Sequence, residues 1–350
     1  MAYTTIDDPT IYFNTKLYTG NGSTGHVITG VGFQPDWVWL KNRNTTNTHE
    51  AFDSVRGATK TLYPDRSDAE YVNATGSLTS FNSDGFTVGS GDGANKSGSG
   101  IASWNWKAGG SASSNTDGSI TSTVSANTTA GFSIVSYTGT GANATVGHGL
   151  GVAPKMFIVK NRSTATNWHV YHHKNTSAPE TDYLLLNTTN ATADNSIVWN
   201  DTAPTSSVFS IGTTDGTNKN TSNMIAYCFA EKKGYSKFGS YTGNGTNNNG
   251  TFFYCGFSPS VVIIKASSSS RNWVILDNKR LGYNDKNYRL FPNLTNAEDT
   301  TSGIIDFTAN GFKLMSNNNT VNESGVTYIV MAFAESPFVN SNGAVPTNAR

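Results

Sequence analysis

The sequence predicts an all-β protein built from three tandem, homologous, antiparallel β-sandwich domains of a jelly-roll-like kind. Composition is the first reason: Asn, Thr, Ser and Gly make up 159 of the 350 residues, and only 14% are charged. Thr and aromatic residues suit strands, whereas Asn, Gly and Ser suit the turns that join them. Turn signals also recur roughly every 8–12 residues, which is typical of short antiparallel strands. Finally, one unit of sequence occurs three times.

The charge balance excludes two other classes of protein. Lys and Arg together number 24 and so do Asp and Glu, which gives a formal net charge of zero. A nucleic-acid binder needs excess positive charge to neutralise phosphates, so this function is excluded. A disordered chain is excluded as well, because net charge is low and aromatic residues reach 11%. No stretch sustains apolar residues at helical spacing, so we expect little helix.

The repeated unit begins with Tyr-Thr-Gly and keeps one order of features in all three copies. The opening tyrosines are Tyr18, Tyr137 and Tyr241. A proline and an apolar strand follow, and the strand ends in Lys41, Lys160 or Lys265. Further along, Asp53 and Asp277 occupy equivalent positions, which His172 takes in the second copy. Each copy closes on a strand that contains aromatic residues. This shared order predicts homologous domains.

The copies predict three domains and one linker. We place the first sandwich at residues 1–108, the second at 131–232 and the third at 233–350 with a C-terminal tail, and call them repeats one, two and three. Residues 109–130 form a linker rich in Gly, Ser and Thr, in which the alternating segment 119–124 could add a strand. Repeats two and three should pack rigidly because they are joined so closely, and repeat one should be more independent. Residues 1–16 should dock on repeat one or complete it as a strand.

The first lysine-terminated strand is apolar on both faces. Side chains alternate along a strand, so Trp37, Trp39 and Lys41 share one face. Val38 and Leu40 share the other face. Such a strand lies inside one sandwich, or places one face in a contact between domains or subunits. Trp37 and Trp39 are therefore candidates for an interface as well as for a core.

The sequence contains no recognisable catalytic, metal-binding or cofactor-binding motif, so we predict no enzyme, no metal and no cofactor. His169, His172 and His173 lie close together, but without paired cysteines they favour a solvated loop over a metal site. Cys228 and Cys255 lie among aromatic residues, and we interpret them as buried free thiols.

Charged residues at equivalent positions predict structural contacts. Two cross-strand ion pairs are expected, Lys41 with Asp53 and Lys265 with Asp277. Arg56 and Arg280 follow the two acids by three residues, and we interpret them as loop anchors or interface residues. A single acid in each of repeats one and three, with His172 at this position in repeat two, does not fit an active site that needs a pair of carboxylates.

Trp199 is the tryptophan that we select for an exposed contact. It lies outside the repeated pattern and precedes the polar residues Asn200 and Asp201. A flat aromatic face beside polar groups suits a sugar, because the sugar can stack on the apolar face of the indole while the polar neighbours at the edge bond its hydroxyl groups. The tryptophans inside the repeated pattern are interpreted as core residues.

The sequence also carries an expectation about location. The first residues lack a basic segment followed by an apolar core, so we expect no secretory signal peptide. The longest aliphatic run, residues 261–264, is far shorter than the ~20 residues that a membrane span needs. We therefore expect synthesis in the cytosol and no insertion into a membrane.

Several longer strings carry a family resemblance over nearly the whole chain. They are residues 8–13, 17–22, 34–43, 52–57, 81–86, 226–231, 234–238 and 331–335. In these strings the chain resembles tandem-domain structural proteins of marine tailed bacteriophages, which are described as tail-fibre-like or virion-associated. The family offers no catalytic residues to carry over. The second repeat departs most, because it lacks the Asp-Ser-x-Arg-Gly pattern around His172.

The resemblance implies a non-enzymatic virion protein, most directly a tail-fibre or receptor-binding component that attaches to the host through many weak contacts. The implied partners are other virion proteins, further copies of this chain, and a glycan or protein of the host surface. The implied location is the virion, after assembly in the host cytoplasm. A capsid decoration protein of the cement or head-fibre kind is a close alternative. A glycan depolymerase and a free carbohydrate-binding module are further alternatives.

Overall fold

The computed structural model describes residues 3–280, 284, 287–301 and 303–345. Within these residues the regular structure is nearly all β, and neighbouring strands run antiparallel. The helices described are four single turns of four residues and one 3₁₀ turn. The predicted all-β class is therefore confirmed. No helix in the described ranges is long and apolar enough to cross a membrane.

The elements of each repeat follow one order. Repeat one contains η1 (Pro9–Ile11), β1 (Phe13–Thr19), β2 (His26–Thr29), β3 (Trp37–Asn42), β4 (Glu50–Asp53), β5 (Lys60–Thr61), β6 (Tyr71–Val72), β7 (Leu78–Asn82), β8 (Gly85–Val88), α1 (Asp92–Asn95) and β9 (Gly100–Trp106). The linker and repeat two contain β10 (Ser113–Asn115), β11 (Ser122–Asn127), β12 (Phe132–Thr138), β13 (Ala144–Gly147), β14 (Met156–Asn161), β15 (His169–His172), β16 (Asp182–Leu185), β17 (Ala193–Asp194), α2 (Ser196–Trp199), β18 (Val208–Ile211), α3 (Asp215–Asn218) and β19 (Asn223–Phe229). Repeat three contains β20 (Ser236–Thr242), β21 (Phe252–Tyr254), β22 (Phe257–Ala266), β23 (Val274–Asp277), β24 (Ile305–Thr308), β25 (Gly311–Leu314), α4 (Asn319–Asn322) and β26 (Thr327–Pro337).

Each repeat contributes the same pattern of four paired strands. The orders are β1-β9-β3-β4, β12-β19-β14-β15 and β20-β26-β22-β23. In every repeat the last strand therefore lies between the first strand and the lysine-terminated strand. In repeat two the sheet is longer, because β11 and β10 extend one edge while β16 and β17 extend the other. Smaller sheets accompany these four strands, in the orders β2-β8-β7, β13-β18 and β21-β25-β24.

The repeated Tyr-Thr-Gly motif ties the first strand of each repeat to its short helix. The tyrosine hydroxyl donates to a backbone carbonyl in or beside that helix: Tyr18 to Ala94, Tyr137 to Thr217 and Tyr241 to Val321, at 2.6, 2.6 and 2.7 Å. The glycine of the motif lies against the backbone that follows the helix. A Cβ atom at Gly20 would lie 2.2 Å from the carbonyl oxygen of Lys96, so only glycine fits.

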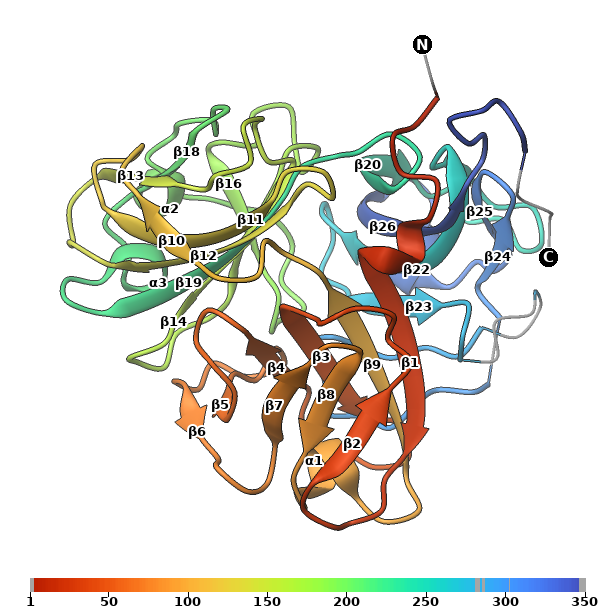
Figure 1. The fold of residues 1–350 in the computed structure, drawn as a ribbon. Coiled ribbons are helices and arrows are strands. Elements are labelled where there is room, and N and C mark those ends of the chain that lie inside the picture. The colour runs from red at the N-terminus through yellow and green to blue at the C-terminus, as the bar shows by residue number, and fades with distance from the viewer. Residues whose placement is uncertain (1–2, 281–283, 285–286, 302, 346–350) are drawn as a thin grey trace.

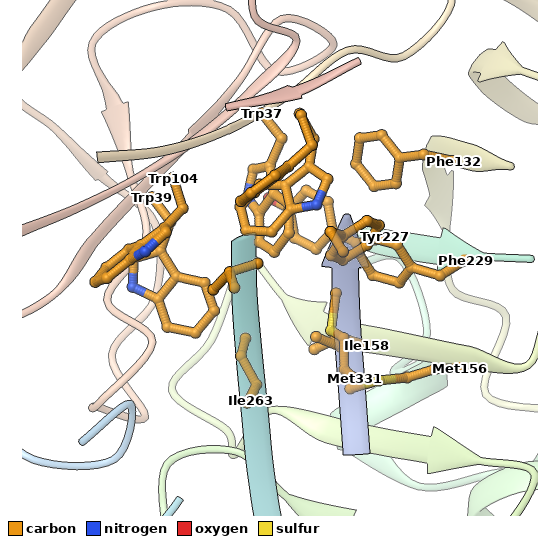
Figure 2. Close-up of a cluster of buried hydrophobic side chains, with 14 of the residues drawn as sticks. Trp37, Trp39, Trp104, Phe132, Met156, Ile158, Tyr227, Phe229, Ile263 and Met331 are labelled. Atoms are coloured by element: carbon orange, nitrogen blue, oxygen red, sulfur yellow. The ribbon is translucent and has the colours of Figure 1, made fainter. Parts of the chain in front are cut away.

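The described side chains form cores of two kinds. One face of each set of four strands packs against the smaller sheet of its own repeat. The opposite faces meet in one central core, which contains Trp37, Trp104 and Trp106 of repeat one, Phe132, Ile158 and Tyr227 of repeat two, and Ile263, Met331 and Phe333 of repeat three. Figure 1 shows the repeats as three lobes around a common centre, and Figure 2 shows the side chains that converge there.

Repeat one is not more independent than the others, so that expectation is wrong. Trp37 stacks on Tyr227 of repeat two, with ring centroids 4.5 Å apart and planes 19° apart. Phe13 of repeat one stacks on Phe333 of repeat three at 5.2 Å. A flexible linker sequence permits two domains to separate, but burial of these rings outweighs the freedom that separation would give.

The N-terminal segment reaches two repeats. Residues 13–16 begin β1 and pair with β9, so this part completes repeat one as a strand. Earlier residues lie on repeat three instead: the hydroxyl of Tyr3 donates to the carbonyl of Gly256 at 2.8 Å, and that of Thr4 donates to the carbonyl of Lys233 at 2.8 Å. The segment thus links the first and last repeats.

Candidate functional site

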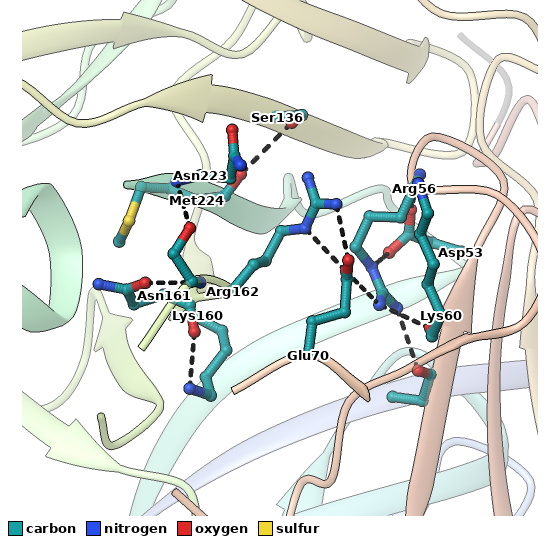
Figure 3. A network of polar contacts seen from close by, with 12 residues as sticks. Asp53, Arg56, Lys60, Glu70, Ser136, Lys160, Asn161, Arg162, Asn223 and Met224 are labelled. Atoms are coloured by element: carbon teal, nitrogen blue, oxygen red, sulfur yellow. Dashed lines mark hydrogen bonds and ion pairs between the residues drawn. The ribbon is translucent and has the colours of Figure 1, made fainter. Parts of the chain in front are cut away.

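The contact between repeats one and two is built on a buried ionic bridge. Arg56 bonds Asp53 of its own repeat at 2.5 Å and Glu70 at 3.1 Å. Glu70 in turn accepts from Arg162 of repeat two at 2.8 Å. Tyr227 of repeat two donates its hydroxyl to Asp53 at 2.7 Å. Figure 3 shows the contacts among Asp53, Arg56, Glu70 and Arg162, in which Arg56 has no exposed side-chain surface.

The contact between repeats three and one repeats this bridge with equivalent residues. Arg280 bonds Asp277 at 2.6 Å and Glu298 at 2.8 Å. Glu298 accepts from Arg43 of repeat one at 2.6 Å. The indole nitrogen of Trp104 takes the place of the tyrosine hydroxyl and donates to Asp277 at 3.0 Å. Arg56 and Arg280 therefore anchor their loops and also lie at contacts between repeats.

The contact between repeats two and three has lost the bridge. The three equivalent positions carry short neutral side chains, namely Asn175, Thr192 and Ser267. The backbone arrangement remains, because the amide of Thr192 donates to the carbonyl of Ser267 at 2.9 Å. The equivalent amides of Glu70 and Glu298 donate to the carbonyls of Arg162 and Arg43 at 2.9 and 2.8 Å. Only the side chains differ.

The residue that His172 faces explains why repeat two has a histidine where the other repeats have an aspartate. Tyr227 and Trp104 donate to the acids of repeats one and three, and the equivalent residue in repeat three is Met331, which has no donor to offer. An aspartate there would be a buried acceptor without its donor, which is costly. His172 instead lies 3.2 Å from the carbonyl of Val330, and burial lowers the pKa of His172 to about 3, so the neutral ring donates this bond.

The three repeated lysines also connect neighbouring repeats. Lys41 donates to the carbonyl of Thr295 in repeat three, Lys160 to that of Ser67 in repeat one, and Lys265 to that of Thr189 in repeat two, at 3.0, 3.2 and 3.0 Å. Each repeat thus holds a loop of another repeat, and the three contacts close a ring. Burial lowers the pKa of Lys41 and Lys160 to about 8 and that of Lys265 to about 7.

The predicted ion pairs of Lys41 with Asp53 and of Lys265 with Asp277 are wrong. In the antiparallel register Trp37 faces Asp53, so Lys41 lies four residues farther along β3. At about 3.3 Å per residue, the backbone of Lys41 lies roughly 13 Å along the strand from the position that faces Asp53. Repeat three has the same register, with Val261 facing Asp277. Asp53 and Asp277 therefore pair with Arg56 and Arg280 and not with the lysines.

Comparison with known proteins adds one finding. The profile of DUF7483, described as a domain of unknown function, matches residues 8–337 as one unit. The chain belongs to the DUF7483 family. Neither the search of curated proteins nor the search of solved structures found a match. The matched range in this DUF7483 chain includes repeat two, all but the terminal ends of repeats one and three, and every residue of the two bridges.

Trp199 of the DUF7483 chain is not an exposed contact, so that prediction is wrong. Its side chain is only 1% exposed. The ring packs edge-on against Phe157 with centroids 4.8 Å apart, and its indole nitrogen donates to the carbonyl of Asp182 at 3.1 Å. The polar residues after it end α2, with Asn200 in the left-handed conformation, and they indicated a helix terminus rather than an exposed ring.

Trp37 and Trp39 of the DUF7483 chain face the central core between the repeats. Trp37 contacts rings of repeat two, whereas Val38 on the opposite face lies in the core of repeat one. The indole nitrogen of Trp39 donates to Nδ1 of His49 at 2.9 Å. His49 then lies 3.1 Å from the carbonyl of Phe291 in repeat three, and burial lowers its pKa, so the neutral ring donates.

The histidines of β15 do not lie in a solvated loop, because His169 and His172 are buried in this strand. His173 follows them and lies 2.9 Å from the carbonyl of Phe238. In the described part of the chain, no group of three or more His, Cys, Asp or Glu side chains could hold a metal ion. Cys228 and Cys255 are buried free thiols, as predicted.

The residues missed by sequence reasoning are the outer members of the two bridges: Arg43, Arg162, Glu70 and Glu298. A signal for the arginines is present, because Lys-Asn-Arg ends the equivalent strand in repeats one and two, whereas repeat three has Lys-Ala-Ser. The two glutamates lie in loops of different sequence, where neither spacing nor a shared motif marks them.

Glu50 in repeat one makes stability depend on pH. Burial, with a smaller contribution from Asp65, raises its pKa to about 7, and one of its carboxyl oxygens is buried without a hydrogen bond to any described residue. An acid with a raised pKa binds its proton more tightly in the folded chain, so stability falls as pH rises from about 4.5 to about 7. Glu50→Gln is expected to remove about 3 kcal/mol of this loss, at 1.36 kcal/mol per pKa unit.

Denaturant unfolding at several pH values between 4 and 8 measures this effect. Asp65→Asn serves as the comparison, because burial also raises the pKa of Asp65, to about 6. Parallel stability profiles for the parent and Glu50→Gln would contradict the assignment.

Proposed function

We propose that this chain is a non-enzymatic structural protein of a tailed-bacteriophage particle, most directly part of its tail-fibre or receptor-binding apparatus. The closed ring of three repeats carries the proposal. A single chain of this shape offers three similar loop regions around one centre, which suits a partner with threefold symmetry. The similarity of its sequence strings to virion proteins of marine phages supports the same role.

The finer fold assignment is part of this proposal. Each repeat would be a small β-sandwich, with its four paired strands as one layer and its smaller sheet as the other. The three sandwiches would have arisen from one ancestral unit, at residues 1–108, 131–232 and 233–350. The shared strand orders support this origin, and the bridge residues at equivalent positions support it too.

A rigid module fits attachment better than a hinged one. The bridges, the lysine contacts and the central core all join different repeats, so the three loop regions keep fixed relative positions. Because the loop regions are already fixed relative to one another, several weak contacts with a partner can form together without a further loss of conformational freedom. Together these weak contacts give strong attachment. In the particle, partners would be other virion proteins, copies of this chain and the host surface.

Capsid decoration is the second candidate, and the ring favours it as well. One chain with three similar repeats could sit on a threefold position of a shell, where each repeat would meet an equivalent neighbour. The two locations differ in copy number, because a shell presents hundreds of equivalent positions and a tail presents only tens.

Quantitative mass spectrometry of purified virions tests the proposal. We expect this chain in the particle, at a ratio to the major capsid protein that indicates tens of copies. Hundreds of copies would move the assignment to decoration. A chain found in infected cells but missing from purified particles would overturn both candidates. Release of saccharide from host envelope by the purified chain would instead indicate a depolymerase.

A further inference from the structure

The contact between repeats two and three contains an open space where the other two contacts hold a bridge. Asn175 occupies the position of Arg56 and Arg280, while Thr192 and Ser267 occupy the positions of the glutamates and outer arginines. These shorter side chains line a cavity of about 560 Å³. Its remaining wall is formed mostly by the small polar residues Thr176, Ser240, Ser268 and Thr327, together with Ala191 and Lys174. The loss of the bridge therefore coincides with a cavity.

A second cavity of about 490 Å³ adjoins the first, since Lys174 and Ser240 line both. Its wall carries Lys155, His173 and Tyr254. Tyr254 is 52% exposed, so its ring is accessible. We call the two cavities together the interrepeat groove. Their volumes lie in the range of about 300–1,000 Å³ that is usual for binding sites of small ligands.

The buried wall of the groove has an unused hydrogen-bond donor. Asn175 is 3% exposed, and its side-chain oxygen accepts from the hydroxyl of Thr192 at 2.7 Å. Its side-chain nitrogen is buried and has no hydrogen-bond partner among the residues that the structure describes. An unpaired buried donor is costly, so a ligand acceptor at this position would recover the lost free energy.

The groove also carries positive charge. Lys237 is paired with Glu231 at 2.8 Å. Lys155 and Lys174, in contrast, have no carboxylate within 4.0 Å among the described residues. Two lysines that form no ion pair among the described residues, beside hydroxyl and amide groups, fit a ligand that is rich in hydroxyl groups and bears an anionic group.

We propose that the interrepeat groove binds an acidic saccharide, one that carries carboxylate or sulfate groups. Asn175, Thr192 and Ser267 would bond sugar hydroxyls, the ring of Tyr254 would stack on a sugar face, and Lys155 and Lys174 would bind the acidic groups. The proposal goes beyond the virion role and does not depend on it, because a fibre tip and a shell protein could both carry this groove.

An extended acidic peptide fits the groove less well. Such a peptide would add to the free edge of β20, where its backbone would need open partners. At Phe238 that edge is already occupied, because Glu231 accepts from its amide at 3.1 Å and His173 lies 2.9 Å from its carbonyl. The edge therefore lacks the continuous row of free groups that strand addition uses.

The sharpest test restores the outer pair of the missing bridge, the glutamate and the arginine of the neighbouring repeat. Thr192→Glu with Ser267→Arg places in the groove the pair that already joins the other two contacts. The same two types of substitution at exposed sites of repeat one, Thr29→Glu with Ser23→Arg, form the control. Calorimetric titration would use tetragalacturonate, a chondroitin sulfate hexasaccharide, cellotetraose and hexaglutamate as probes, with circular dichroism to check the fold.

We expect the parent and the control to bind the two acidic saccharides with Kd values of roughly 0.1–1 mM, and the restored-bridge variant to bind them at least tenfold more weakly while folded. Lys174→Ala should weaken the acidic saccharides and leave cellotetraose unchanged. The proposal is overturned if neither acidic saccharide binds the parent, if the restored-bridge variant binds them as the parent does, or if hexaglutamate or cellotetraose binds equally well.

Discussion

Replacement of Arg56 by alanine is expected to destabilise the folded chain by about 3–5 kcal/mol, because it leaves the buried carboxylate of Asp53 without its cation, whereas Glu70 keeps Arg162. Asp53 has no exposed side-chain surface, and Glu70 is 12% exposed. Arg56 also donates to the carbonyls of Ala51 and Lys60, and both would lose this donor in the variant. Denaturant unfolding, followed by tryptophan fluorescence, measures the difference in free energy.

Arg66→Ala is the matched control for this experiment. Arg66 also pairs with an acid of its own repeat, Asp68, at 3.0 Å, but the two side chains are 51% and 45% exposed. An exposed pair of this kind contributes about 0–1 kcal/mol. Equal losses for Arg56→Ala and Arg66→Ala would show that the bridge between repeats one and two has no special role in stability.

Replacement of Trp37 by alanine should have an effect of similar size, about 3–5 kcal/mol, for a different reason. Its ring is 2% exposed, and it contacts Trp106 at 4.4 Å and Tyr227 at 4.5 Å between centroids. The change leaves a large cavity in the central core, where rings of two repeats meet. Loss of stacking with Tyr227 adds to the cost.

The measurement for Trp37→Ala is again denaturant unfolding, and two further variants sharpen it. Within the described part of the chain, the indole nitrogen of Trp37 has no hydrogen-bond partner, so Trp37→Phe removes volume without breaking such a bond and should cost less. Val27→Ala in the same repeat alters a side chain that is 54% exposed and should be close to neutral. A Trp37→Ala loss below about 1 kcal/mol would contradict the assignment of this ring to a shared core.

Much of the fold could be predicted because turns and strands leave local signals. The Tyr-Thr-Gly motif and the lysine-terminated strand mark equivalent elements, and the three copies of each occur at equivalent places in the sheets. Local sequence does not show which other part of the chain packs against each face of a strand. The alternation of Trp37, Val38 and Trp39 indicates two buried faces but does not say that one of them meets other repeats.

The errors have the same origin. Lys41 and Asp53 are at equivalent spacing in two repeats, yet the register that separates them is fixed by pairing between strands and not by spacing along one strand. Trp199 precedes polar residues, yet its position in α2 points its ring toward the core of repeat two. Contacts over long sequence separations, such as Arg162 with Glu70, were beyond local reasoning for the same reason.

The central claim is that the three repeats share one core and fold as one unit. Differential scanning calorimetry of the parent chain and of Trp37→Ala tests it most directly. We predict a single transition with equal calorimetric and van't Hoff enthalpies, which moves as a whole to lower temperature in the variant. Separate transitions in the parent, with only the one that belongs to repeat one shifted by Trp37→Ala, would contradict the claim.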